Sequence, residues 1–337
     1  MTQQPVVSEK EGPATAVEAA AGLQDVWWRR LLFVPTIGLL LLLAIVPLIF
    51  SLGVSLFNYS IGSKPIWVGL DNYSMFTDLF TKPLVVLQFL LGLGNHTSAL
   101  TDPQFWLATK VTVQFTVAAV SIEVVLGILL GFVMNQRFTG MGILRLIVFL
   151  PMMLAPFVVG LFWRFMFDQT FGIVDYLLTQ IGLPAVPWLI HPLWARVAVV
   201  IVDVWQWTPF VTLLILAGLG TVPTDLLEAA TLDRASNWMK FRQIYWPYLR
   251  FPLLLALLFR SIDTLKLFDS PFILTGGGPG NFSTTLSILG YRYQIMFFSV
   301  GMAAAISWVV VIIINIVTNV LVRLITPTRV EQVHTGL

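Results

Sequence analysis

Residues 31–57 read LLFVPTIGLLLLLAIVPLIFSLGVSLF and contain no charged side chain. This stretch exceeds the roughly 20 apolar residues with which a helix crosses the hydrocarbon core of a bilayer. It is too long for the apolar region of a signal peptide, and no small-residue cleavage site follows it, so we interpret it as a retained helix. Of the 337 residues, 57% are hydrophobic and 11% are charged, whereas soluble domains carry about 25% charged residues. The sequence therefore predicts an integral membrane protein.

Five further segments have the length and apolar character of transmembrane helices. They are residues 111–134, 144–167, 197–219, 251–274 and about 297–325. The segment 111–134 holds one charge, Glu123, whereas 251–274 holds four and is the least apolar. We predict an all-α, polytopic membrane protein with six transmembrane helices.

Lys and Arg are unevenly distributed over the connecting segments, and this asymmetry predicts the orientation. They are more frequent in residues 1–30, in the loop 221–250 and after residue 322 than in the segments of the opposite side. Because cytoplasmic loops carry the excess of Lys and Arg, both termini and this loop should be cytoplasmic. We expect a cytoplasmic N-terminal tail over residues 1–30 that is mostly disordered over 1–25, a transmembrane domain over 31–325 and a second cytoplasmic tail over 326–337.

The 221–250 loop is rich in charge for this chain and has the pattern of a helix, a turn and a second helix. Thr224 or Asp225 after Pro223 is suited to cap the first helix, with Glu228 in its first turns. In the second helix, the apolar side chains recur on one face; they are Trp238, Phe241, Tyr245 and Leu249. This pattern alone fits either an interfacial helix that anchors the bundle or a surface that contacts a cytoplasmic partner.

Residues 228–247, EAATLDRASNWMKFRQIYWP, resemble the EAA motif of bacterial ABC importer permeases. The matching positions are Glu228, Ala229, Ala230, Asp233, Ala235, Phe241, Ile244 and Pro247. The resemblance implies that the 221–250 loop is a coupling helix docked on a partner ATPase, with Glu228 at the contact. It also implies that ATP and Mg²⁺ bind to two such partners, and that this chain itself binds no cofactor.

Other motifs are similar to the carbohydrate-uptake permeases of the maltose and glycerol-phosphate type, in particular to the first of their two unlike permeases. They are VGLDNY at 68–73, DPQFW at 102–106, Leu150 and Pro151, residues 162–164, and LTGGGPG at 274–280. The resemblance covers most of residues 31–325. It implies a second, unlike permease, an external solute-binding protein and a place in the bacterial inner membrane.

Arg234 departs from the family pattern, which has glycine after the aspartate. Glycine supplies a positive φ at a turn between helices, a conformation that costs an ordinary residue about 1 kcal/mol or more. Either the first helix continues through Arg234 or the turn lies elsewhere. Arg234 could also add a charged contact to the ATPase.

Charged and polar side chains within the predicted spans are candidates for a translocation path. Four charges lie three residues apart in 251–274, as one stripe: Arg260, Asp263, Lys266 and Asp269. Such charges face a bundle interior or a water-filled path and pair with one another. They either offer hydrogen bonds to sugar hydroxyls or form ion pairs that fix helix packing.

The segment 197–219 raises the same choice, because it contains Asp203, Trp205, Gln206 and Trp207. An aromatic ring stacks on the apolar face of a sugar while an amide binds its hydroxyls, but membrane Trp residues also serve packing. We expect Glu123 to pair with a basic or hydroxyl group of another helix or of the partner permease. Gly127 and Gly131 form a GxxxG pattern, typical of close helix contacts.

The segment GGGPG consists of Gly276, Gly277, Gly278, Pro279 and Gly280 and lacks the following Lys-Ser or Lys-Thr of a phosphate loop. It is either a simple turn or, as the resemblance implies, a loop near the external gate and the binding-protein surface. The chain has no cysteine and three dispersed His, which give no support for a metal site.

These observations together predict the permease subunit of an ATP-driven importer for a sugar or sugar derivative. The chain has no Walker A sequence and is not expected to hydrolyse ATP. Glycerol phosphate and polyols are alternative substrates within the same class. An ion-coupled secondary transporter is the rival from another class, but the internal repeats typical of that class are not evident. A membrane-embedded enzyme would need a catalytic cluster, and none stands out.

Overall fold

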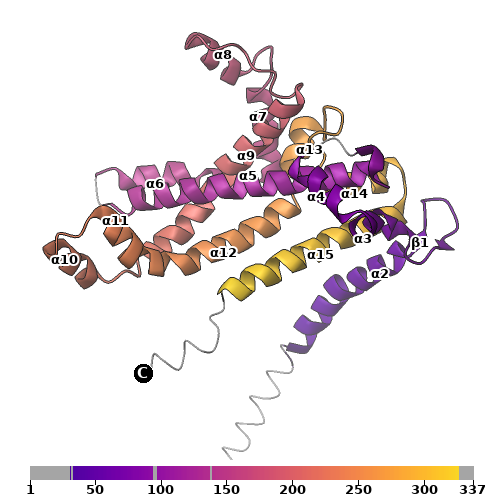
Figure 1. Ribbon diagram of the computed structural model, residues 1–337, viewed down its shortest axis with the longest axis horizontal. Helices are drawn as coiled ribbons and strands as arrows, with labels where there is room; N and C mark the ends of the chain where they lie inside the picture. Colours follow the sequence, from indigo (N-terminus) through magenta and orange to yellow (C-terminus); the bar gives the residue numbers. More distant parts are fainter. Residues whose placement is uncertain (1–30, 32, 94–96, 137–138, 326–337) are drawn as a thin grey trace, which may run out of the picture. The chain divides into compact units, whose positions relative to one another are not determined.

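The computed structural model describes residues 31, 33–93, 97–136 and 139–325 (Figure 1). The predicted tails at 1–30 and 326–337 lie outside the described residues. The chain divides into two compact units, one up to Val54 and one from Ser55 onward. Each unit is described by itself.

The first unit contains the charge-free stretch. A helical span covers Phe33–Ser55, with a π-helical turn η1 at Leu41–Ile45 followed by α2 at Val46–Ser55. Its side chains are almost all exposed and apolar, as expected of a helix whose solvent is lipid. The first predicted span is therefore confirmed as a helix long enough to cross a membrane, and this helix lies within the predicted bounds 31–57.

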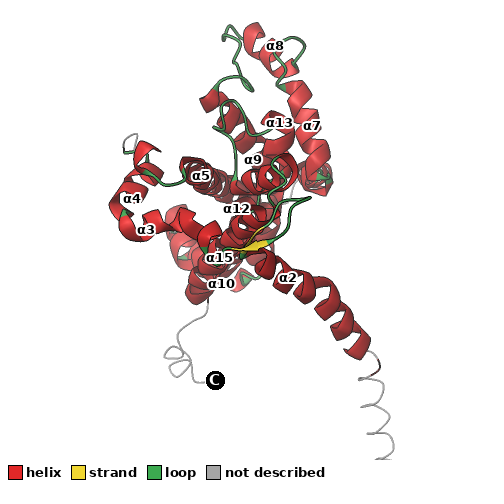
Figure 2. Ribbon diagram, turned by 90° about the vertical axis from the view of Figure 1, so that its right-hand side faces the viewer, coloured by secondary structure: helices red, strands yellow, loops and turns green. Residues whose placement is uncertain are grey.

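The second unit opens with a segment that precedes the second predicted span, and this segment is largely structured. Two short strands, β1 at Phe57–Asn58 and β2 at Ile66–Trp67, pair antiparallel; Figure 2 shows them as a small hairpin among helices. The following elements are η2 at Asp71–Phe76, α3 at Thr77–Thr81, α4 at Pro83–Leu91 and η3 at Thr97–Ala99. The chain bends by 89° between α3 and α4.

Four long helices form the centre of the second unit: α5 at Pro103–Met134, α9 at Pro192–Leu219, α12 at Trp246–Leu265 and α15 at Val300–Ile325. Helices α5, α9 and α12 pack against one another, and α15 packs on α12 (Figure 1). Asp102 caps α5 by accepting a hydrogen bond from the Phe105 amide at 3.0 Å. The second span therefore begins in the DPQFW motif and not at Val111.

Gly127 and Gly131 allow α5 and α9 to approach closely. A Cβ at Gly127 would lie 2.6 Å from a Val211 methyl group, and one at Gly131 would lie 2.6 Å from a methyl group of Ile215. Real Cβ atoms do not reach such distances, so both positions need glycine in this packing. The GxxxG pattern is thus a helix contact, as predicted.

Six continuous spans are not confirmed. Among the described residues, four helices are long and apolar enough to cross a membrane: Phe33–Ser55, Pro103–Met134, Pro192–Leu219 and Val300–Leu324. The bent pair from Asp71 to Leu91 would raise the number to five. Multiple apolar helices nevertheless establish a multi-pass membrane protein.

The predicted third span, 144–167, is not one helix. It consists of α6 at Met141–Phe149, a 3-10 turn η4 at Pro151–Met153 and α7 at Pro156–Met166. Pro151 and Pro156 cause the break, because proline lacks the N–H of the helical ladder and disfavours helical geometry at the preceding residue.

The predicted fifth span, 251–274, is also interrupted. Helix α12 ends at Leu265, and the separate helix α13 covers Asp269–Thr275. Pro271 suits the first turn of this new helix, where no donor is needed. Helix α14 at Leu286–Tyr291 and the π-turn η6 at Arg292–Met296 then lead to α15.

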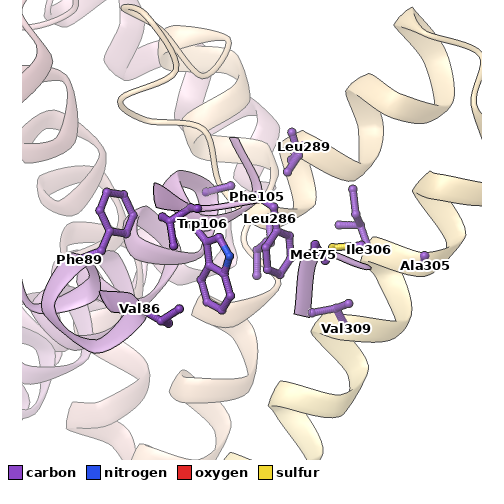
Figure 3. Close-up of a cluster of buried hydrophobic side chains, with 12 residues drawn as sticks. Met75, Val86, Phe89, Phe105, Trp106, Leu286, Leu289, Ala305, Ile306 and Val309 are labelled. Carbon is purple, nitrogen blue, oxygen red and sulfur yellow. The ribbon is translucent and has the colours of Figure 1, made fainter. Parts of the chain in front are cut away.

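Buried apolar side chains join the segment before α5 to the C-terminal helices. Figure 3 shows Met75, Phe105, Leu286, Ile306 and their neighbours in one cluster, to which η2, α4, α5, α14 and α15 contribute. A second cluster joins α5, α7 and α9 to the segment after α7, where α8 covers Ile173–Gln180. These clusters hold the short elements on the ends of the long helices.

Candidate functional site: the 221–250 loop and a buried charged cluster

The 221–250 loop has the predicted helix, turn and second helix. Helix α10 covers Thr224–Leu232, α11 covers Asn237–Lys240, and the π-turn η5 at Phe241–Tyr245 continues into α12. The predicted cap is wrong in detail, because Pro223 occupies the N-cap position and no side chain caps α10. Ser236 caps α11 by accepting from the Met239 amide at 3.2 Å.

Arg234 itself adopts the conformation expected of glycine. Its φ is 53°, and α10 ends two residues earlier at Leu232. The Ala235 amide donates to the Ala230 carbonyl at 2.9 Å, which is the six-residue bond of a Schellman cap. Both alternatives for this position are therefore wrong: the turn stays at Arg234, and arginine takes the left-handed conformation.

The second helix of the 221–250 loop is attached to the bundle by aromatic contacts. Phe241 and Tyr245 pack on Phe132 of α5, with ring centroids 5.9 and 5.1 Å away, and Leu249 is buried. Trp238 stacks on Phe241 at 5.6 Å. The predicted apolar face thus fixes the loop to α5.

The first helix of the 221–250 loop presents its motif residues to the outside. The side chains of Glu228, Ala229, Asp233 and Arg234 are exposed. Leu232 is 85% exposed, which is unusual for leucine and leaves an apolar residue beside the charges. A surface with both charged and apolar groups is suited to a protein partner.

Three helices bring their intramembrane charges together in a charged cluster of Glu123, Asp203 and Arg260. The Arg260 guanidinium donates to both Glu123 carboxylate oxygens at 2.7 and 2.9 Å and to Asp203 Oδ2 at 2.6 Å. The three side chains are at most 1% exposed. Glu123 pairs with a basic residue of another helix, as predicted. Two carboxylates share one guanidinium, and Asp203 Oδ1 has no hydrogen-bond partner in the described chain.

The four charges predicted as one stripe separate into different environments. Asp263 and Lys266 form an ion pair at 3.1 Å and are 41% and 57% exposed. Asp263 lies 4.0 Å from the guanidinium of the buried Arg260. Asp269 belongs to α13 and is exposed. The single stripe is therefore wrong, because the helix ends after Leu265.

The candidate residues Trp205, Gln206 and Trp207 of α9 lie in different environments. Gln206 is buried and donates to the Leu154 carbonyl at 3.0 Å, so it satisfies a backbone group at the break between η4 and α7. Trp205 packs on Trp163 at 5.5 Å. The Arg260 guanidinium lies over the ring of Trp207, with its Cζ 5.0 Å from the ring centroid. Trp207 is thus part of the surroundings of the charged cluster.

The glycine-rich segment forms a turn tied to Arg292. Gly276, Gly277 and Gly280 all have positive φ. Arg292 donates to the Gly276 carbonyl at 2.8 Å and also to the Asn281 side chain. Burial lowers the pKa of Arg292, but a guanidinium stays charged. A Cβ at Gly277 would lie 2.6 Å from the Thr284 hydroxyl, so that glycine is needed.

Comparison with known proteins establishes the family. Residues 123–328 match the family described as the inner membrane component of binding-protein-dependent transport systems. Because this match covers more than half of the chain, the chain belongs to that family. It is a permease subunit of an ABC importer and not an ATPase.

Individual relatives agree. A probable ABC transporter permease of Sinorhizobium fredii, y4oQ, is 42% identical over 72% of this chain and 79% of its own length. The trehalose/maltose transport permease MalF of Thermococcus litoralis is 40% identical over 67% of this chain and 74% of its own. The trehalose permease SugA of Mycobacterium tuberculosis is 34% identical over 79% and 82%. The predicted resemblance to carbohydrate-uptake permeases is confirmed.

Solved structures share the fold. A chain of a bacterial ABC transporter that imports the acidic polysaccharide alginate aligns with a TM-score of 0.71 and 21% identity, over 91% of this chain and 99% of that one. A second structure shows a bacterial alginate ABC transporter in complex with a periplasmic protein that has bound an alginate pentasaccharide. A chain of this structure aligns with the present chain with a TM-score of 0.60.

Sequence reasoning placed each member of the charged cluster in a span but did not bring the three together. Glu123 and Asp203 are the carboxylates of their spans, and Arg260 is the first of four charges in its own. Charges inside a membrane pair with one another. A cation in one span and single carboxylates in two other spans could therefore have predicted that the three side chains meet.

Proposed function

We propose that this chain is the permease subunit of an ATP-driven importer that takes a saccharide into a bacterial cell. The proposal includes cytoplasmic termini, a second and unlike permease, two ATPases that hold ATP and Mg²⁺, and an external solute-binding protein. The names of the trehalose, maltose, sulfoquinovosyl glycerol and lactose permeases among its relatives support a saccharide.

The exposed 221–250 loop is the observation that carries this proposal. Its exposed side chains are free to contact an ATPase; among them are those of Glu228, Ala229, Asp233 and Arg234. Phe241 and Tyr245 attach the loop to α5. When ATP closes the two ATPases, a docked α10 would move with them. The motion would reach α5 and α12 through these aromatic contacts and would switch the central path from inward-facing to outward-facing.

The translocation path would run beside the charged cluster. Arg260 pairs with both Glu123 and Asp203, so the main role of the three side chains is to hold three helices together. The half-exposed Asp263 and Lys266 are better placed to offer hydrogen bonds to sugar hydroxyls. Trp205 and Gln206 of α9 serve packing, and Asp269 and the Gly276–Gly280 turn belong to the external gate or to the binding-protein surface.

Reconstitution tests this proposal. The chain would be co-expressed with the second permease and the ATPases from the same gene neighbourhood and placed in proteoliposomes with the binding protein. Uptake of radiolabelled trehalose, maltose, lactose, glycerol 3-phosphate and sorbitol would be measured with and without ATP inside the vesicles. ATP-dependent uptake of a disaccharide is expected.

Two outcomes would contradict this proposal. Uptake that needs an ion gradient and no ATP would favour a secondary transporter. ATP-dependent uptake of glycerol 3-phosphate or sorbitol alone would keep the transporter class and reject the saccharide.

A further inference from the structure

A cavity of about 370 Å³ lies between α14 and α15, away from the charged cluster. Its walls are formed by two aromatic residues, three polar side chains, aliphatic residues and a glycine: Phe268, Leu286, Ser287, Gly290, Tyr291, Gln294, Ile306, Ser307 and Val310. This volume falls within the range of about 300–1,000 Å³ that is common for small-molecule sites.

The back wall of the cavity consists of buried, well-packed residues. Leu286 and Ile306 are each 2% exposed and belong to the buried cluster of α14 and α15 (Figure 3). Gly290 also lines the cavity, and a Cβ there would come within 3.6 Å of Ile306 and 4.0 Å of the Ser307 hydroxyl. The cavity is therefore a preformed part of the fold.

An aromatic group forms one side of the cavity. The rings of Phe268 and Tyr291 are 5.3 Å apart, and both contact Phe272, at 4.8 and 5.0 Å. Phe272 does not line the cavity but holds the other two rings in place. A ring fixed in this way can stack on the C–H face of a pyranose with little loss of side-chain freedom.

The polar groups of the cavity are available to a ligand. Ser287 and Gln294 make no side-chain hydrogen bond within the described chain, and Ser307 uses only its proton, toward the Ala303 carbonyl at 2.9 Å. An acyl chain would leave these groups without partners, which is costly in an apolar environment. A ring with several hydroxyl groups would satisfy them.

The place of the cavity in the chain also indicates a solute. Phe268 follows the end of α12 by three residues, and the half-exposed pair lies at the same end, with Asp263 in the last turn of α12 and Lys266 directly after it. The 221–250 loop enters the opposite end of α12. The cavity thus lies at the end of α12 that is remote from the proposed ATPase contact.

We propose that this cavity between α14 and α15 is a saccharide subsite that holds one uncharged pyranose ring on Tyr291 and Phe268, with hydrogen bonds to Ser287, Gln294 and Ser307. The subsite rests on the proposed function and adds a second place to the path, on the external side of the charged cluster. It would receive the ring that the binding protein releases and keep it from returning while the path switches.

The test uses the complete reconstituted transporter with trehalose or maltose as the probe, whichever the wild type transports. The measured quantity is sugar molecules imported per ATP hydrolysed at saturating binding protein. Tyr291→Ala should lower this ratio roughly tenfold, the size of one lost pocket contact. ATP hydrolysis stimulated by the loaded binding protein should persist, because docking is untouched. Tyr291→Phe, which keeps the ring, should restore most of the ratio.

The matched control is Phe297→Leu, which changes an exposed aromatic residue at the end of η6 that does not line the cavity, and it should leave the ratio within about twofold. If Tyr291→Ala does not assemble, Gln294→Ala and Ser287→Ala replace it, because Gln294 is exposed and Ser287 is half-buried. They should also lower the ratio.

Three results would overturn the subsite. The first is an unchanged ratio in these variants, and the second is an equal loss in Phe297→Leu. The third is loss of the second permease on purification, which would make the cavity an interface between subunits. A wild type that imports neither sugar would instead reject the proposed function itself.

Discussion

The charged cluster and the 221–250 loop use the same residue types in opposite surroundings. Glu123 is fully buried and receives two hydrogen bonds from Arg260, whereas Glu228 is exposed on α10. Arg260 is 1% exposed and binds two carboxylates. Arg234 is exposed, and no hydrogen bond or ion pair of its guanidinium is found in the described chain.

This difference separates structural charge from charge that is free to contact a partner. A charge inside the bundle must be satisfied within the chain, because no water replaces a missing partner. A charge on the loop costs little to leave free in water. Removing a cluster residue should therefore reduce stability, whereas removing a loop residue should reduce coupling and leave stability unchanged.

Arg260→Leu should have the largest effect on stability. It leaves Glu123 and Asp203 buried as two carboxylates without their cation, and losing one partner of a buried pair costs about 3–5 kcal/mol. The thermal unfolding midpoint of the purified complex would fall sharply. Adding Glu123→Gln and Asp203→Asn to this variant should recover much of the loss, and a single variant as stable as the wild type would break the comparison.

Glu228→Ala should reduce ATP-dependent uptake roughly tenfold or more, equivalent to about 1.4 kcal/mol of coupling. The midpoint of unfolding should not change, because this side chain is exposed. Asp225→Asn, on the same helix and also exposed, serves as the control and should transport normally. Normal uptake by the Glu228 variant would remove this residue from the ATPase contact.

Arg234→Gly should stabilise the turn by up to about 1 kcal/mol, since glycine adopts positive φ without steric cost. Hydrogen exchange at the Ala235 amide, which bonds the Ala230 carbonyl, would slow by a few fold. Arg234→Ala removes the charge but keeps the strain, so the two variants together separate the backbone from the guanidinium. If both variants weaken ATPase binding equally while only the glycine slows exchange, the charge contacts the partner.

Lys266→Ala should have the smallest effect on stability, below about 1 kcal/mol, because both members of its ion pair are half-exposed. Its effect on uptake is the informative measurement. Unchanged uptake would assign Lys266 to the surface and not to the translocation path.

The sequence predicted the elements that depend on local pattern. Gly127 with Gly131 marked a close helix contact, and the pattern of residues 221–250 marked a helix, a turn and a second helix. Pro151 and Pro156 were a signal for the break in the third span. We nevertheless predicted one helix over 144–167, because the segment is apolar along most of its length. Local pattern failed where tertiary structure decides, as in the end of α12 after Leu265 and the meeting of three distant charges.

Arg234 shows a different limit of sequence reasoning. The family has glycine at this position, so arginine suggested a different turn. The backbone instead kept its Schellman cap and its positive φ, because the hydrogen bonds of the cap and the attachment of α11 determine the path of the chain. A strain of about 1 kcal/mol is small beside those constraints.

The π-turn η5 continues directly into α12, so a movement of the 221–250 loop would be transmitted along α12. Trp246 at the loop end of α12 and Arg260 in the charged cluster are about 21 Å apart at 1.5 Å per residue. If α12 tilted by about 10° relative to α5 about its loop end, Arg260 would be displaced from Glu123 by about 3–4 Å, more than the 2.7 Å length of the bond between them. The ion pairs of the charged cluster hold α12 to α5 and α9. A tilt of this size would break them and free α12 to change its position.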